Sequence, residues 1–193
     1  MTRRQSMMAP AMLTVGGTLT MGGGLRPASA AERDGFEALV ETPPRALPEG
    51  LAWTDGEGAA SGPAAFAGRG MVINLWATWC APCVAEMPAL DRLAALLAPQ
   101  GIVVLPLSSD RGGRAQVAPF YERTRLRNLG IWLDPRGTVG RAFSVRGLPT
   151  TIIVGRDGRE RARLEGAAAW DSPRLVAAVR RLAGAEAPAN TST

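Results

Sequence analysis

The chain carries two cysteines, Cys80 and Cys83, and they are the only ones among its 193 residues. They directly follow an apolar run, residues 71–76, and directly precede a segment with helical spacing, residues 84–98. A Cys-x-x-Cys pair between a strand and a helix indicates a thiol–disulfide redox site. Unpaired amide groups and the dipole at the start of a helix favour an anion, so the first thiol ionises more easily. Because the thiolate is the nucleophile in disulfide exchange, we expect Cys80 to attack and Cys83 to resolve the mixed disulfide.

Three other interpretations of the cysteine pair remain open at this point. A structural zinc site needs four ligands, usually Cys and His, and the chain has no His. A purely structural disulfide would close a very short loop, and such a bridge stabilises a fold little. Two buried and inert thiols are the third possibility. Pro82 between the cysteines and the aromatic residues before them favour the redox interpretation.

The elements expected around this pair alternate between strands and helices. The run 71–76 predicts a central strand that is covered on both faces. The helix after the cysteines has its leucines at helical spacing, which indicates core packing. Residues 102–107 predict a second buried strand, in which Pro106 favours a bulge or an early end. The remaining expected elements are a helix over 116–125, a strand over 129–133, a helix over 139–143, strands over 150–154 and 160–164, and a last helix capped by Ser172.

The segment Val72–Pro88, which reads VINLWATWCAPCVAEMP, resembles the active-site segment of the TlpA/ResA-like thiol–disulfide oxidoreductases. These are extracytoplasmic members of the thioredoxin superfamily. The segment Gly147–Thr151 resembles the part of the family that carries a cis-proline, and the likeness covers roughly residues 45–184. The resemblance implies an α/β thioredoxin fold, with a central mixed sheet flanked by helices, an N-terminal extension and a central helix–strand insert. Cytoplasmic thioredoxins have an acidic residue where this chain has Asn74.

Glu86 stands three residues after Cys83, so both lie on one face of the expected helix. The family resemblance implies that Glu86 exchanges protons with the cysteine pair, because burial beside a redox pair can tune a carboxyl group. On spacing alone, the favoured interpretation of Glu86 is a solvated acid in the first turns of the helix that interacts with the helix dipole. Asn74 can form hydrogen bonds but carries no proton. If a proton acceptor is needed below the cysteines, Glu86 must supply it.

Residues on both sides of the cysteines are expected to contact a substrate. Pro82 sets the turn between the two cysteines and suits a first helical turn. Pro149, if cis, lies against Cys80 in this family, and the backbone of Leu148 would then bind an extended substrate chain. Trp79 is the aromatic residue expected to touch substrates. The sequence calls for no cofactor and no metal ion.

The ends of the chain differ from its middle. Residues 1–30 have the charged start, apolar stretch and Ala-x-Ala site of a signal peptide, with cleavage expected after Ala30. The start also resembles a twin-arginine signal, so the export route stays open, and an uncleaved anchor is the alternative. We expect a linker over 31–50, a thioredoxin-like domain over 51–184 and a disordered tail over 185–193. Export places the protein in the periplasm or cell envelope, where disulfides persist.

The formal charge of +5 says little about partners. All 22 basic residues are arginine, and without residues 1–30 there remain 19 arginines against 17 acids. We find no basic stripe with interleaved aromatic residues, so nucleic acid is not an expected partner.

Four functions fit a pair of this kind to different degrees. The resemblance favours a reductase of disulfides in extracytoplasmic client proteins, such as apocytochrome c or oxidase copper-site cysteines. A membrane thiol-electron transporter would be its reductant. An oxidant that introduces disulfides is the alternative from the same chemical class. A copper-handling chaperone of thioredoxin-like fold is a third, since two thiolates can hold Cu(I). A thiol peroxidase would need a single activated cysteine in another setting.

Overall fold

The computed structural model describes residues 34–184. The signal peptide predicted over 1–30 and the tail predicted over 185–193 lie outside the described residues. Within residues 34–184, no helix combines the length and the apolar character that crossing a bilayer requires.

An eight-stranded mixed sheet forms the centre of the fold, in the order β1-β8-β7-β4-β5-β6-β2-β3. Strand β4 pairs in parallel with β5 and antiparallel with β7. The strands are β1 (Leu39–Ala46), β2 (Trp53–Asp55), β3 (Ala60–Ser61), β4 (Met71–Trp76), β5 (Val103–Ser108), β6 (Trp132–Leu133), β7 (Thr150–Val154) and β8 (Arg159–Glu165).

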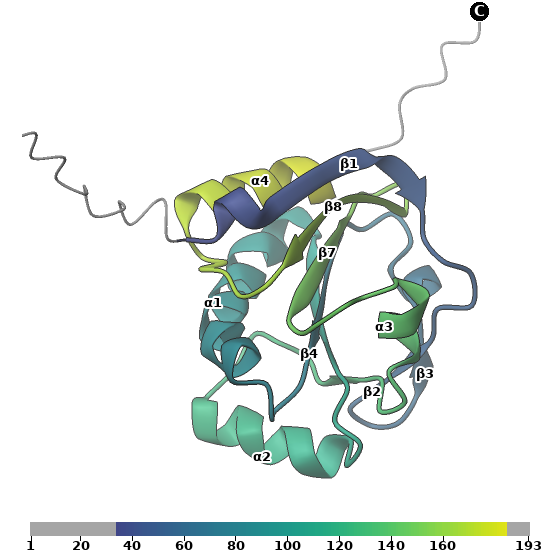
Figure 1. The fold of residues 1–193 in the computed structure, drawn as a ribbon, viewed down its shortest axis with the longest axis vertical. Helices are drawn as coiled ribbons and strands as arrows, with labels where there is room; N and C mark the ends of the chain where they lie inside the picture. The colour runs from purple at the N-terminus through teal and green to yellow at the C-terminus, as the bar shows by residue number, and fades with distance from the viewer. Residues whose placement is uncertain (1–33, 185–193) are drawn as a thin grey trace, which may run out of the picture.

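Helices cover both faces of this sheet (Figure 1). Helices α1 and α4 lie on one side and the short helix α3 lies on the other, while α2 packs at one end of the first layer. The helices are α1 (Ala81–Leu97), α2 (Arg114–Thr124), α3 (Thr138–Ala142) and α4 (Pro173–Ala183), with short 3₁₀ turns at Phe36–Ala38, Pro63–Phe66 and Ala98–Gln100.

Strand β4 lies at the centre of the sheet, and all six of its residues are buried. Because side chains alternate across a strand, Val72 and Trp76 pack under α1 and α4, and Ile73 packs on the opposite face. Asn74 therefore points toward the α1 and α4 layer. The sequence predicted this strand with the correct bounds, since a continuous apolar run is typical of a strand buried on both faces.

Residues 39–46 were expected to belong to a linker, and they form the edge strand β1 instead. β1 pairs antiparallel with β8, and its register shifts between Glu41 and Arg45. The two prolines in that interval have no N–H to donate, and an edge strand with a bulge tolerates this loss. The sheet therefore includes residues that the sequence assigned to the linker.

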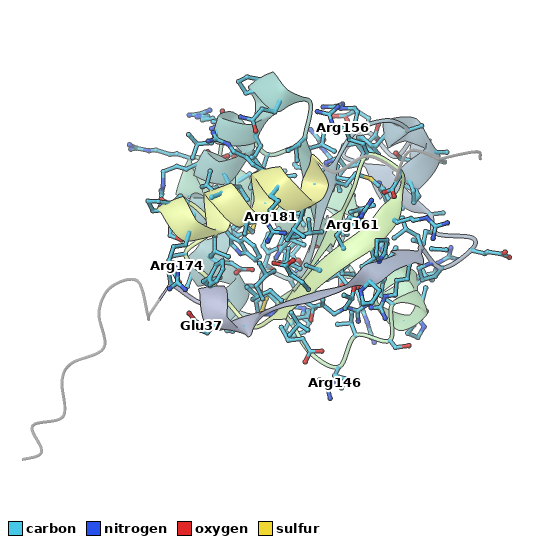
Figure 2. The ribbon with its side chains drawn as sticks, turned by 90° about the horizontal axis from the view of Figure 1, so that it is seen from above. Glu37, Arg146, Arg156, Arg161, Arg174 and Arg181 are labelled. Carbon is cyan, nitrogen blue, oxygen red and sulfur yellow. A yellow bond between two sulfur atoms is a disulfide. The ribbon has the colours of Figure 1, made fainter. Side chains whose placement is uncertain are left out.

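Ion pairs fasten the start of β1 to helix α4. Arg174 Nη2 lies 2.6 Å from Glu37 Oε1, and Arg181 pairs with Glu41. Figure 2 shows Arg174 beside Glu37 below the start of α4, with Arg181 farther along the helix. These pairs are exposed, so each contributes little to stability. They nevertheless set the position of the chain on the surface of the domain.

Pro106 causes neither the bulge nor the early end expected for β5. The strand pairs in register with β4 through Pro106 as far as Ser108. Val103 donates its N–H to the Gly70 carbonyl on the β4 side. By alternation, Pro106 turns its nitrogen away from β4. The two-residue strand β6 pairs only with Leu107 and Ser108. No strand of the described chain faces the Pro106 nitrogen, so the N–H that proline lacks is not needed for sheet pairing.

Candidate active site

Cys80 and Cys83 lie at the start of α1, where β4 ends and the helix begins. Cys80 is the N-cap residue, and its sulfur accepts a hydrogen bond from the Cys83 amide at 3.3 Å. Pro82 lies in the first turn, where its missing N–H would have no helical partner. The two sulfurs form a disulfide, with 5.2 Å between the Cα atoms. The structure therefore shows the oxidised form of the pair.

The two sulfurs differ in their access to solvent. Cys80 is 7% exposed and Cys83 is fully buried. Trp79, directly before Cys80, is 68% exposed, which is unusual for so large an apolar side chain. Trp76 is buried instead and packs against Phe120 and Tyr121. The outer sulfur is thus flanked by an exposed aromatic surface, and the inner sulfur faces the core.

In the reduced protein, Cys80 is expected to react with an alkylating reagent faster than Cys83 at pH 7. The N-cap position lowers the pKa of the Cys80 thiol, and burial slows access to Cys83. If about half of the Cys80 thiol is ionised at pH 7, it should react roughly ten times faster with the reagent than an ordinary free cysteine. The comparison uses the single-cysteine variants Cys83→Ala and Cys80→Ala over a range of pH. Faster labelling of Cys83 would reverse the assignment.

Pro149 follows a cis peptide bond, Leu148–Pro149. It directly precedes β7, which pairs with β4. Leu148 is partly buried and packs against both core clusters, and the Thr150 hydroxyl donates to the Gly147 carbonyl at 2.8 Å. The sequence predicted the cis bond through the family resemblance, and the structure contains it.

Glu86 is buried on α1, one turn beyond Cys83, with 3% of its surface exposed. Its Oε1 accepts a hydrogen bond from Asn74 Nδ2 at 2.8 Å. Its Oε2 accepts from the Ala168 amide at 3.0 Å and from the Trp170 indole Nε1 at 2.8 Å. Burial raises the pKa of Glu86 from 4.5 to about 7, although these three hydrogen bonds oppose the rise by stabilising the ionised form. The carboxyl group can therefore gain or lose a proton near neutral pH.

Asn74 connects Glu86 to strand β7. Its Nδ2 donates to Glu86 and also to the Thr151 hydroxyl at 2.9 Å. Its Oδ1 has no hydrogen-bond partner among the described residues. By the family resemblance, this amide stands where cytoplasmic thioredoxins have an acidic residue. Glu86 is the acidic group that the structure brings to this place.

A buried aspartate holds the loop that leads into Cys80. Asp110, after β5, is fully buried. It accepts hydrogen bonds from the Thr78 amide and hydroxyl at 2.9 and 2.7 Å. It also accepts from the Ser108 hydroxyl at 2.8 Å and from Gln116 Nε2 at 2.7 Å. Sequence reasoning missed this group, because nothing in the local pattern links residue 110 to residue 78.

Trp170 and Ala168 were also missed. They lie 84 and 82 residues beyond Glu86, in the loop between β8 and α4. The only local signal is a tryptophan placed just before the helix cap Ser172, and such a residue is most often simply part of the core.

Comparison with known proteins identifies the family of the chain and several relatives. The AhpC/TSA family model matches residues 46–162. The ResA thiol–disulfide oxidoreductase of Geobacillus thermodenitrificans is 32% identical over 101 residues, which cover 52% of this chain and 57% of that protein. The ResA protein of Oceanobacillus iheyensis is 32% identical over 104 residues, covering 54% and 53%. The chain thus spans just over half the length of these curated relatives.

Solved structures show the same fold at lower identity. A secreted disulfide oxidoreductase of Mycobacterium tuberculosis, described as homologous to E. coli DsbE, aligns with a TM-score of 0.58 and 23% identity. The alignment covers 68% of this chain and 96% of that one. A secreted thiol–disulfide isomerase of Corynebacterium glutamicum aligns with a TM-score of 0.61 and 20% identity, covering 76% and 89%.

The fold and the paired cysteines define a protein of thioredoxin fold with a Cys-x-x-Cys disulfide at the start of helix α1. The chain belongs to the AhpC/TSA family, and its ResA relatives support the resemblance to the TlpA/ResA-like proteins.

Proposed function

We propose that this protein reduces disulfides in client proteins outside the cytoplasm through a Cys80–Cys83 dithiol–disulfide cycle. The observation that carries the proposal is the pairing of the helix-capping disulfide with a buried carboxyl group one helical turn further on. A nucleophile, a resolving thiol and a proton acceptor lie in sequence along one helix. Disulfide exchange needs these three groups.

The reaction balances with these three groups, the client disulfide and protons from solvent. The Cys80 thiolate attacks one sulfur of the client disulfide, forms a mixed disulfide and releases the other client sulfur as a thiolate. Cys83 passes its proton to the Glu86 carboxylate and attacks the Cys80 sulfur. The second client sulfur then leaves, and the Cys80–Cys83 disulfide forms. The client gains two electrons and the cysteine pair loses two. The two client thiolates take up two protons, one released when Glu86 returns to its carboxylate form and one from solvent.

The exposed surface next to the disulfide supports a protein substrate. Trp79 gives an apolar contact beside Cys80, and we assign substrate binding also to Pro82 and to the backbone of Leu148 before Pro149. The family resemblance supports clients of the apocytochrome c or oxidase copper-site type and a membrane thiol-electron transporter as the reductant. The N-terminal pattern supports a location in the periplasm or cell envelope.

A Cys83→Ala variant is expected to accumulate in cells as a covalent complex with its client. Cys80 can still attack, but no second thiol is present to resolve the mixed disulfide. A reductant then cleaves the mixed disulfide, and mass spectrometry of the released protein identifies the client. The N-terminal peptide of the same sample shows whether the exported chain begins near Ala31.

The matched control is Cys80→Ala, which retains the buried thiol and should trap nothing. Equal trapping by both variants, or none by Cys83→Ala, would contradict the proposed cycle. The reduction potential settles the direction of the reaction. A value near about −270 mV fits a reductase, and one near about −120 mV fits the alternative oxidant.

A further inference from the structure

The loop between β8 and α4 supplies two of the three hydrogen bonds to Glu86. Both reach Oε2, one from the Ala168 amide and one from the Trp170 indole. Trp170 is fully buried, so water does not compete for this contact. An indole N–H can only donate, and a backbone N–H can only donate. The loop therefore offers Glu86 donors alone, which suits an ionised carboxylate.

We propose that Trp170 is a positioning residue for Glu86. Its indole N–H fixes the orientation of the carboxylate, which α1 carries one turn beyond Cys83, and favours the form that accepts a proton. The proposal rests on the proton-accepting role of Glu86 set out under Proposed function. It adds a residue outside both the cysteine motif and the cis-proline segment.

The surroundings of the loop support a fixed donor rather than a chance contact. Asp34 accepts a hydrogen bond from the Ala169 amide through its backbone carbonyl at 2.8 Å. Its side chain accepts from the Ser172 hydroxyl at 2.9 Å and from the Phe36 amide at 2.9 Å. Asp34 is itself 5% exposed. The residues before β1 therefore hold the loop on both sides of Trp170.

The groups that face Glu86 from each element are few. Strand β4 contributes Asn74, and the loop contributes Ala168 and Trp170, none of which titrates near neutral pH. On its own helix, Cys83 is the titratable neighbour on the same face. In the oxidised protein that sulfur is bonded to Cys80 and does not titrate. The oxidised form thus isolates the titration of Glu86.

The test is Trp170→Phe in the oxidised protein, which keeps an aromatic ring and removes the N–H. The pKa of Glu86, followed by carboxyl ¹³C NMR and assigned by its loss in Glu86→Gln, is expected to rise by about one unit. A hydrogen bond to a charged group has this size. Trp53→Phe is the matched control, because Trp53 is buried on the other face and its indole nitrogen has no partner among the described residues. It should leave the pKa unchanged.

A measurement on the unchanged protein covers the case in which Trp170→Phe fails to fold. The ¹H–¹⁵N indole signal of Trp170 should titrate with the midpoint of Glu86, since its acceptor changes charge. That titration should vanish in Glu86→Gln. An unshifted pKa in a folded Trp170→Phe, or an indole signal that does not follow pH, would overturn the proposal. If the pKa shifts while the pH profile of disulfide reduction stays the same, Trp170 positions Glu86 but the proton role proposed for Glu86 fails.

Discussion

Glu86→Gln is expected to remove a pH dependence from both the stability and the activity of the protein. The wild-type carboxyl group has a pKa of about 7 in the fold and 4.5 in its ordinary environment. Between these values the folded chain retains a proton that the unfolded chain has lost. Rising pH therefore lowers the free energy of unfolding. The contribution that Glu86 makes to stability is fully present below pH 4.5 and is lost as the pH rises through 7. The difference corresponds to roughly 3 kcal/mol.

The variant itself should fold. Glutamine retains an oxygen that can accept from Ala168 and Trp170. Rotation of the Asn74 amide would turn its unpartnered Oδ1 toward the new NH₂ group. Chemical denaturation of the oxidised proteins at pH 4.5 and 8 measures the effect. The wild type should lose about 3 kcal/mol relative to Glu86→Gln over this interval.

Disulfide reduction by Glu86→Gln at pH 7 should be slower by on the order of a hundredfold, the usual size of general acid–base catalysis. The loss should be visible in the rate and in its pH profile. Retained activity with an unchanged profile would return Glu86 to a structural role. An equal fall in stability with pH for both proteins would show that the carboxyl group does not titrate near pH 7.

Asp110→Ala is expected to lower the free energy of unfolding by roughly 1 to 3 kcal/mol, because it leaves the buried Ser108 hydroxyl and the half-buried Thr78 donors without an acceptor. Four hydrogen bonds end on its carboxylate. Two of them come from Thr78, two residues before Cys80. Loss of the anchor should therefore also loosen the loop that presents Cys80, and both thermal unfolding and the alkylation rate of Cys80 should change.

Asp91→Ala is the matched control for this substitution. Asp91 also accepts four hydrogen bonds, from the amides of Arg127, Asn128 and Leu129 and from the Asn128 side chain. It lies on α1 about 16 Å along the helix from Cys80. The control should be destabilised by a similar amount with little change in Cys80 reactivity. Equal changes in reactivity for both variants would attribute the Asp110 effect to general destabilisation.

The sequence predicted the parts of the site that are close together along the chain. Strand β4, the helix start, Cys80 and Cys83 all follow from one continuous pattern of apolar spacing and a short motif. The role predicted for Glu86 came from the family resemblance, since spacing alone favoured a solvated residue. The environment of Glu86 could not be predicted in this way. Its burial depends on β7 and on the loop containing Trp170, and these approach it only through sheet pairing and the packing of α4.

The edge strand β1 was missed for a related reason. Its residues read as extended chain, and two consecutive prolines suggested a linker. Only the pairing with β8 and the ion pairs to α4 identify it as part of the sheet. A sequence shows that a segment is extended, but the partner strand determines whether it is fixed.

The prolines of β1 also bear on how the protein meets other chains. Pro43 and Pro44 have no N–H and lie where the register of β1 shifts, so the middle of this edge strand offers another chain neither a regular ladder nor these two donors. The opposite edge is β3, which has only two residues. Neither border offers the long row of donors and acceptors on which another strand could grow. In the function proposed above, these borders would shield the protein from joining its client chains edge to edge, and would leave contact to the end of the molecule where the sulfurs lie.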